Sequence, residues 1–416
     1  MRINPSPSAR YIFLCVMLLF SSAAFCQYAE KTLKKLASPA FQGRGYYKNG
    51  DGIAADFIRE EFKEIGLQPV NGTYFQPFTF PVNTFPGAMD VQIGDKKLTA
   101  GKDYIVSPAC PGVKGEFELV KVTLTSQQFK PENFILIDKT GLDSTDSAAM
   151  DSISRNPPNV RGVIVVEPQK LTWSVSGKVN DQVFIRILKS SLPEKTGTIK
   201  LNIENKFLMA HTANNVMGFI PGSQYPDSFI VFTAHYDHLG RMGKKALFAG
   251  ANDNASGSTM ILDMARYYSI PENRPKLSVL FIAFAGEEAG LIGSKYYTEN
   301  PPLPLEKIRF LLNLDLMGNG QDGVMVVNGE VFEKEFAIMD SINKDMKLVK
   351  EVGKRGKARN SDHYWFSEKG VPAFFLYTQG GSKAYHDIYD VPSALKLEEF
   401  EDVKKLLLEF VSTLTR

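Results

Sequence analysis

Residues 228–235, "SFIVFTAH", form an apolar run that ends in a histidine. A helical pattern follows at residues 256–268, "SGSTMILDMARYY", and another apolar run follows at residues 276–285, "KLSVLFIAFA". The alternation continues through "EEAGLIGSKYY", "RFLLNLDLMG" and "PAFFLYT". Apolar strands that alternate with helices are typical of an α/β fold, so we predict a mostly parallel central sheet flanked by helices.

Two amphipathic helices are expected outside this alternating region. Apolar side chains recur at helical spacing over residues 53–65, and the pattern stops at Gly66. A similar pattern over residues 400–414 predicts a helix that closes the chain.

The composition is that of an ordinary globular protein. The chain has 416 residues, of which 44% are hydrophobic, and this is enough for a large core and two or three domains at most. The formal net charge is only +2. Nothing in this balance points to nucleic acid or to an anionic membrane surface as a partner.

Residues 1–26 have the pattern of a secretory signal peptide. Arginines precede and border an apolar run from Tyr11 to Phe20, and small residues follow it. The run is too short for a comfortable membrane span, so we expect cleavage near Cys26 and Gln27 and a secreted or periplasmic protein without stable membrane insertion. A lipoprotein anchor at Cys26 is the less favoured option, because the bulky Phe25 precedes it.

Removal of this leader would leave Cys110 as the sole cysteine. No internal disulfide is then possible. We interpret Cys110, in "SPACPG", as a turn or core residue rather than a nucleophile.

The texture of the chain changes between residues 86 and 207. Short β-like runs such as "NFILID" and "VRGVIVVE" are broken by Pro, Gly, Ser and Asp, and no long helical period is visible. We predict an inserted β-rich domain at 86–207 that has its own core and can be removed. Residues 27–85 and 208–416 would together form the main domain.

Acidic and histidine side chains follow the predicted strands at five places. In sheets of this kind ligands bind beyond the carboxyl ends of the strands, so these residues are expected to converge. They are His235, Asp237, Asp253, Glu287, Glu288, Asp315 and His386. Singly, each has an ordinary interpretation as a helix cap or a satisfied core residue. Together they carry a large desolvation cost, and no Lys or Arg lies beside their segments in the sequence, so a metal site is predicted.

The ligand count favours two zinc ions per chain. If Asp253 bridges the ions, His235 with Asp315 completes one position and Glu288 with His386 completes the other. A shared water makes each ion four-coordinate, as zinc prefers. On a strand, His235 and Asp237 would project to the same face, which would let Asp237 orient the imidazole.

These motifs resemble a known family. "HYDH", "NDNASG", "FAGEEAGLIGS", "NLDLMG" and "YHDIYD" look like the metal motifs of the secreted two-zinc aminopeptidases, which include aminopeptidase Y and bacterial leucyl aminopeptidase. The resemblance implies the ligand set given above, with Asp253 as the bridge, Glu287 as general base and Asp237 as catalytic support. It also implies hydrolysis of peptide substrates at a free N-terminus, and a protease-associated domain at the position of the insert.

The neighbouring residues are interpreted more simply. We predict that Glu287 and Glu288 open a helix, where successive side chains point about 100° apart and must divide their work. "NSDHYWF" resembles a further family segment, but a helix N-cap is the simpler account of Ser361 and Asp362. His238 has no place in the ligand count and is treated as structural.

Three alternatives remain open at this point. A glutaminyl cyclase keeps much of this acidic pattern with a single zinc. A carboxypeptidase would bind a terminal carboxylate, for which the basic run at 350–360, "KEVGKRGKARN", is a candidate. Some relatives are receptor ectodomains that lack the metal site, although every expected ligand is present in this sequence.

Overall fold

The computed structural model describes residues 27–124 and 128–415. The predicted signal peptide, residues 1–26, lies outside the described residues. Within the described ranges, no helix combines the length and the apolar character needed to cross a membrane.

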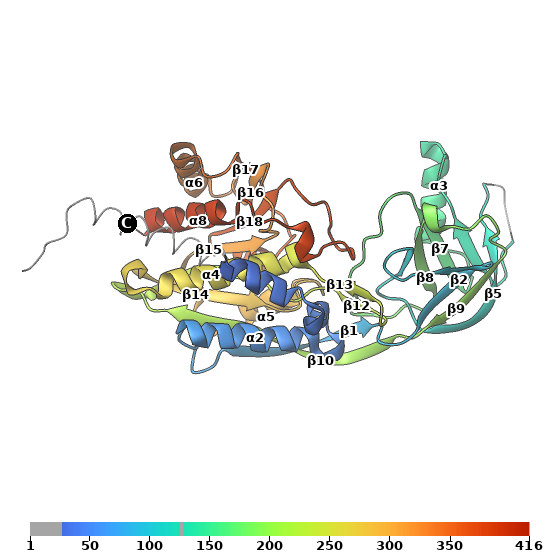
Figure 1. The fold of residues 1–416 in the computed structure, drawn as a ribbon, viewed down its shortest axis with the longest axis horizontal. Coiled ribbons are helices and arrows are strands. Elements are labelled where there is room, and N and C mark those ends of the chain that lie inside the picture. Colours follow the sequence, from blue (N-terminus) through green and yellow to red (C-terminus); the bar gives the residue numbers. More distant parts are fainter. Residues whose placement is uncertain (1–26, 125–127, 416) are drawn as a thin grey trace, which may run out of the picture.

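An eight-stranded mixed sheet forms the centre of the larger lobe (Figure 1). Its four central strands, β14, β11, β15 and β18, run parallel, and antiparallel partners lie on both sides of them. The predicted α/β fold with a mostly parallel centre is confirmed. In spatial order the strands are β1 (Phe75–Thr84), β10 (Lys206–Ile220), β14 (Leu277–Phe284), β11 (Tyr225–His235), β15 (Ile308–Asp315), β18 (Ala373–Gln379), β16 (Gly323–Val327) and β17 (Val352–Arg355).

Helices cover both faces of this sheet, because its central strands are apolar on both sides. One face is covered by α2 (Gly50–Ile65), α4 (Gly257–Ser269), α6 (Glu333–Met346) and α8 (Phe400–Leu414). The other face is covered by α5 (Ile292–Glu299) and α7 (His363–Glu368). The helices expected at 53–65 and 400–414 are α2 and α8.

The smaller lobe contains a second eight-stranded sheet, at the right of Figure 1. In spatial order its strands are β3 (Lys96–Leu98), β2 (Met89–Ile93), β9 (Thr198–Ile203), β5 (Val113–Lys121), β6 (Phe134–Ile137), β7 (Gly162–Glu167), β8 (Val183–Leu188) and β4 (Tyr104–Val106). We call residues 89–203 the second unit. The paired strands β1 and β10 lead into it and out of it.

The second unit also contains a helix that the sequence pattern did not show. This helix, α3 (Ser144–Arg155), is mostly polar, and Met150 is its one fully buried residue. Its start is capped by Asp143, whose side chain accepts a hydrogen bond from the backbone N–H of Asp146. Asp143 as a helix cap was the sequence signal that could have predicted α3, because its apolar residues show almost no helical period.

The second unit has buried clusters of its own residues, and the larger of these clusters also takes in side chains of the main domain; the removable insert stays a prediction. Phe85 packs into the larger cluster, as do four buried residues from a later part of the main domain: Leu239, Met242, Ala246 and Phe248. These four come from the hairpin of β12 (Gly240–Met242) and β13 (Ala246–Phe248) and from the residue before it. Removal of residues 86–207 would expose this hairpin to water. Cys110 lies in the same cluster and is buried, as predicted for a core residue.

We expect the two lobes to unfold in one transition, because they share this core. Phe248→Ala should lower the free energy of unfolding by about 3–5 kcal/mol and shift the unfolding of both lobes. In a Trp365→Phe background, Trp173 is the sole tryptophan and its fluorescence reports on the second unit. Far-ultraviolet circular dichroism reports mainly on the helices around the central sheet.

The control is Met209→Ala, which changes an exposed side chain and should leave both midpoints in place. Two separate urea transitions, with Phe248→Ala moving only one of them, would show that the lobes are independent.

Candidate metal centre

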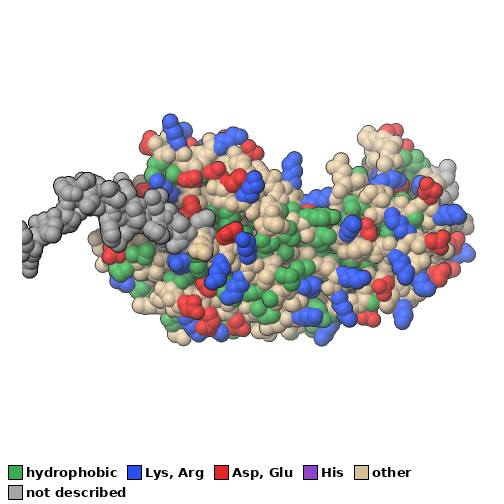
Figure 2. Space-filling model, viewed as in Figure 1, with side chains coloured by type: hydrophobic (Ala, Val, Ile, Leu, Met, Phe, Trp, Pro, Cys, Tyr) green, Lys and Arg blue, Asp and Glu red, His purple; other side chains and the backbone are tan. Residues whose placement is uncertain are grey.

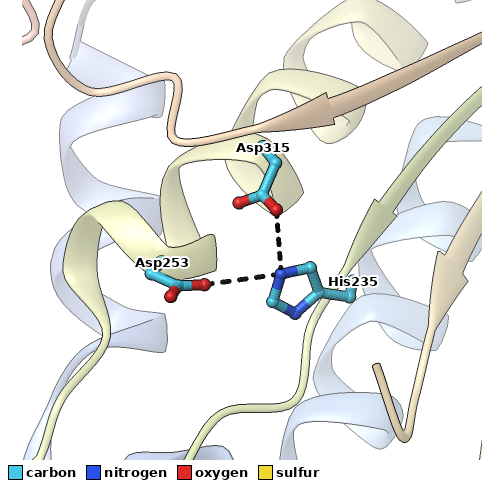
Figure 3. Close-up of side chains that lie close together, drawn as sticks. All are labelled: His235, Asp253 and Asp315. Carbon is cyan, nitrogen blue, oxygen red and sulfur yellow. Dashed lines mark hydrogen bonds and ion pairs between the residues drawn. The ribbon is translucent and has the colours of Figure 1, made fainter. Parts of the chain in front are cut away.

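Three predicted site residues meet beyond the carboxyl ends of β11 and β15 (Figure 3). His235 ends β11, Asp315 ends β15, and Asp253 lies in the short π-helical segment Ala251–Ser256 that leads into α4. The Nε2 atom of His235 is 3.4 Å from Asp253 Oδ1 and 3.3 Å from Asp315 Oδ2. Parallel strands place their carboxyl ends at one edge, which is why residues 80 positions apart become neighbours.

A second cluster lies on the other side of Asp253. The Nε2 atom of His386 is 3.0 Å from Asp253 Oδ2 and 3.3 Å from Glu288 Oε2. The other oxygen of Glu288, Oε1, is 2.7 Å from Nδ1 of His238. His238 was treated as structural, yet it is fully buried at the site and contacts a predicted ligand.

The distances between these side-chain atoms suit zinc. Tetrahedral ligands at the usual zinc distances of about 2.0–2.2 Å stand roughly 3.3–3.6 Å from one another. The donor set of imidazole nitrogens and carboxylate oxygens is also one that zinc prefers. The clusters His235, Asp253, Asp315 and His238, Asp253, Glu288 each bring their donor atoms within 4.8 Å of one another.

The charges of the site are poorly balanced by the protein alone. Burial raises the pKa of Glu287 well above its ordinary value, and nearby carboxylates add to this effect against the opposing charge of His235. Burial likewise raises the pKa of Asp315. Burial works against the charged form of His235, but Glu287 and Asp315 outweigh it and raise the pKa of His235 well above the usual range. Buried Oδ1 of Asp315 also lacks a hydrogen-bond partner. A bound cation would neutralise these buried carboxylates and give the unpaired oxygen a partner.

Asp237 positions the two glutamates more than it positions the histidine. Its carboxylate accepts hydrogen bonds from the backbone N–H groups of Glu287 and Glu288 at 3.2 and 3.3 Å, and from the hydroxyl of Tyr46 at 2.6 Å. The ring nitrogen Nδ1 of His235 is nearer to the backbone carbonyl of Asp237, at 3.2 Å, than to its carboxylate, at 3.8 Å. The strand ends at His235, so the two side chains do not share a strand face as predicted.

Glu287 and Glu288 do not open a helix, and that prediction was wrong. They lie in a turn, and α5 begins only at Ile292. Gly286, with φ +69°, and Gly290, with φ +113°, give the turn its left-handed backbone positions. The division of work between the glutamates therefore depends on the turn and on Asp237, and not on helical geometry.

A buried cation missed by the sequence reasoning supports the site. Arg44 is fully buried and donates to the backbone carbonyls of Tyr236, Ala249, Gly250 and Asp253 at 2.6–3.2 Å. No Lys or Arg adjoins the site segments in sequence, but this guanidinium reaches them from "QGRG" through tertiary contact. Asp390 adds a second support, because its carboxylate accepts from the backbone N–H groups of Asn252 and Asp253.

Asp362 stands at the N-cap position of α7, as predicted, but it does not cap the helix with its side chain. Both carboxylate oxygens are buried, and the hydroxyl of Ser294 is a nearby group that favours the ionised form. Burial raises the pKa of Asp362 to about 7, against the favourable charge of His235. The hydroxyl of Ser361 accepts from the side-chain amide of Asn313 on β15 and is likewise no cap.

Replacement of Asp362 should change how stability depends on pH in the metal-free protein. Asp362 has a pKa of about 7 in the folded protein, against an ordinary value of 3.8. Between about pH 4 and pH 7 the folded state therefore binds more protons than the unfolded state, and the stability of the protein falls as pH rises. Asp362→Asn removes this loss. The melting temperature of this variant should exceed that of the parent by about 2–4 °C near pH 7 and match it near pH 4.

Thermal unfolding in a chelator across this pH range tests the expectation. Asp95→Asn, an exposed aspartate, is the control and should leave the pH dependence unchanged. A difference between Asp362→Asn and the parent that is the same at every pH would contradict the assignment.

Comparisons with known proteins bear on this geometry. Residues 215–411 match the model of Peptidase family M28. Aminopeptidase YwaD of Bacillus subtilis (strain 168) is 29% identical over 211 residues, which are 48% of this chain and 42% of that protein. Leupeptin-inactivating enzyme 1 of Streptomyces exfoliatus is 31% identical over 169 residues, 40% of this chain and 36% of that protein. The matches thus span less than half the length of these curated relatives.

The fold is shared with a solved zinc aminopeptidase. The structure of BSAP from Bacillus subtilis superimposes with a TM-score of 0.68 over 93% of this chain and 94% of that chain, at 19% sequence identity. The resemblance drawn from the motifs is confirmed, since the matching region contains all five metal motifs. Residues 215–411 are therefore similar to peptidase family M28.

Proposed function

We propose that the protein is a two-zinc aminopeptidase that removes N-terminal residues from peptides. The observation that carries the proposal is the position of Asp253, which presents Oδ1 to His235 and Oδ2 to His386. One carboxylate between two donor clusters is the arrangement of a bridging ligand. The two positions would be held by His235 with Asp315 and by Glu288 with His386.

Zinc ions bound there would lower the pKa of a water molecule and stabilise the oxyanion that forms on the scissile carbonyl. Glu287 is then the general base. Its Oε2 atom is 3.9 Å from Nε2 of His235, close to the site but outside the donor clusters. Its raised pKa suits a group that takes a proton from water and returns it to the leaving amine.

The supporting hydrogen bonds keep the two glutamates in different roles. Asp237 holds the backbone of both, so the turn cannot rotate to exchange them. His238 holds Oε1 of Glu288, which leaves Oε2 directed at His386. We therefore assign Asp237 and His238 as positioning residues.

The geometry weighs against the two enzymatic alternatives. A single-zinc cyclase has no use for a second donor cluster. A carboxypeptidase needs a cationic group that is available to a terminal carboxylate. In the basic run 350–360, at the sheet edge around β17, the three lysines form ion pairs with Asp322, Glu333 and Glu368. Of its two arginines, Arg355 donates to the hydroxyl of Tyr377, and Arg359 lies over the rings of Tyr364 and Trp365. The names of the relatives, among them an aminopeptidase and a zinc aminopeptidase, support the same choice.

Export is part of the proposal and rests on residues 1–26, whose sequence has the pattern of a signal peptide. N-terminal sequencing of the mature protein tests it directly, with a start near Gln27 expected. The protease-associated assignment of the second unit stays a prediction.

Substrate and metal requirements test the proposed activity. The zinc-loaded protein should hydrolyse aminoacyl amides and free-amine peptides and leave their N-acetylated forms intact, because the free N-terminus is part of the recognised group. A chelator should abolish this activity, and elemental analysis should give two zinc ions per chain in the active form. Cleavage of N-acetylated peptides, cyclisation of an N-terminal glutaminyl peptide, or full activity without metal would overturn the assignment.

The two glutamates should fail differently when substituted. Glu287→Gln keeps the shape and loses the base, so both zinc ions should remain while kcat falls by roughly 10²–10⁴-fold. Glu288→Gln should weaken or lose one ion, and added zinc should restore only part of the rate. Zinc content and rate are measured side by side on both variants. Zinc loss from Glu287→Gln with full retention by Glu288→Gln would reverse the two roles.

A further inference from the structure

One proposed ligand, His386, is supplied by a loop and not by a strand end. This loop runs from the end of β18 and has no regular secondary structure over residues 380–391. It begins with Gly380 and Gly381, both with positive φ, and His386 itself has φ +54°. A non-glycine residue in the left-handed region is uncommon and persists where its surroundings hold it.

The second unit makes a reciprocal contact with His386. The backbone N–H of Trp173 donates to the carbonyl of His386 at 2.9 Å. The carbonyl of Trp173 lies 3.0 Å from the ring nitrogen Nδ1 of His386. A carbonyl can only accept, so Nδ1 carries a proton, and Nε2, which faces Asp253 and Glu288, is the ring nitrogen that would bind an ion.

The next residue of the loop is also held by the second unit. The ammonium group of Lys170 is 3.0 Å from Oδ2 of Asp387 and donates to the carbonyl of Lys383 at 2.9 Å. Asp387 in turn accepts from the backbone N–H groups of Tyr385 and Tyr389, on either side of His386. Lys170 thus secures the turn in which His386 lies.

The third consecutive residue, Ile388, packs against the hydrophobic core of the second unit. Its side chain lies over Gly101, where a Cβ atom would come within 2.8 Å of it. Three neighbouring residues of the loop therefore contact three separate places in the second unit. In Figure 1 the loop extends from the larger lobe toward the second sheet, and Figure 2 shows that the upper edge of the molecule is hollowed between the lobes.

The holding segment is itself firmly anchored. Lys170 and Trp173 lie in the loop of residues 168–182 between β7 and β8. The indole N–H of Trp173 donates to the carbonyl of Val106 at 2.9 Å. Its ring packs 4.7 Å from the ring of Phe248, a residue of the main domain. The anchor thus joins both lobes.

We propose that the second unit is a positioning element for the metal centre: the 168–182 loop, through Trp173 and Lys170, orients His386 toward its ion. This inference rests on the proposed two-zinc function. His235, Asp253, Glu288 and Asp315 belong to the main domain, whereas the orientation of His386 depends on contact between the lobes. The ion at the His386 position is therefore retained only while the lobes stay together.

The test measures zinc retention and not only activity. Lys170→Met removes both contacts of the ammonium group, and Trp173→Phe removes the hydrogen bond to Val106. Each variant should release one of the two zinc ions at roughly 10-fold lower chelator concentration than the parent and keep the other ion. Lys170→Arg retains a cation and should restore parental retention. Lys178→Met, which alters an exposed lysine of the same loop, should behave as the parent.

Circular dichroism checks that each variant is folded. If one of the two variants fails to fold, the other still tests the inference. Parental zinc retention in folded Lys170→Met and Trp173→Phe overturns the inference. Release of both ions in step, or a loss that Lys170→Arg does not restore, also overturns it. Failure of the proposed function is distinguishable, because the parent protein itself would then hold fewer than two zinc ions or leave aminoacyl amides intact.

Discussion

Buried carboxyl groups that converge at one edge of the central sheet impose the main constraint on this protein. Desolvation disfavours each of them, and each raises the cost of ionising the next. Burial raises the pKa of Asp237 to about 6 and that of Asp362 to about 7. Asp253 is the exception: burial opposes its charge, but hydrogen bonds from His235 and His386 hold its pKa well below the ordinary value. Asp253, which two imidazoles contact, is the carboxylate proposed to bridge two zinc ions.

The protein supplies part of the compensating charge and uses it to build the loops. Burial lowers the pKa of Arg44 to about 10, a value that still leaves the guanidinium charged at neutral pH. The guanidinium of Arg44 donates its hydrogen bonds to backbone carbonyls around the site and not to a carboxylate. The loops are therefore held in place while the carboxylate oxygens of the donor clusters remain available to a metal ion. Asp237 and Asp390 hold the loops in the same way, because their carboxylates accept hydrogen bonds from backbone N–H groups.

The site is also where the two lobes meet. The hairpin of β12 and β13 packs into the core of the second unit, and the loop that carries His386 contacts the same unit beside it. A β-rich insert that looked detachable in the sequence is thus joined to the larger lobe by apolar packing and by hydrogen bonds. Both connections lie beside the metal centre, which makes the arrangement of the lobes relevant to the chemistry.

The sequence by itself determined those features whose causes are local. The alternation of apolar strands and helices predicted the α/β fold, and the amphipathic periods predicted α2 and α8, because periodicity reflects the face that each element buries. Strand ends predicted the candidate ligands, because parallel strands bring their carboxyl ends together. Only the tertiary structure decided the rest. Contacts between distant segments, which no local pattern records, decide how Arg44 reaches the site, how Asp362 is buried and how Trp173 holds His386. They also decide the turn at Glu287. The helix α3 and the shared core were not predicted for the same reason, because each is stabilised by a partner elsewhere in the chain.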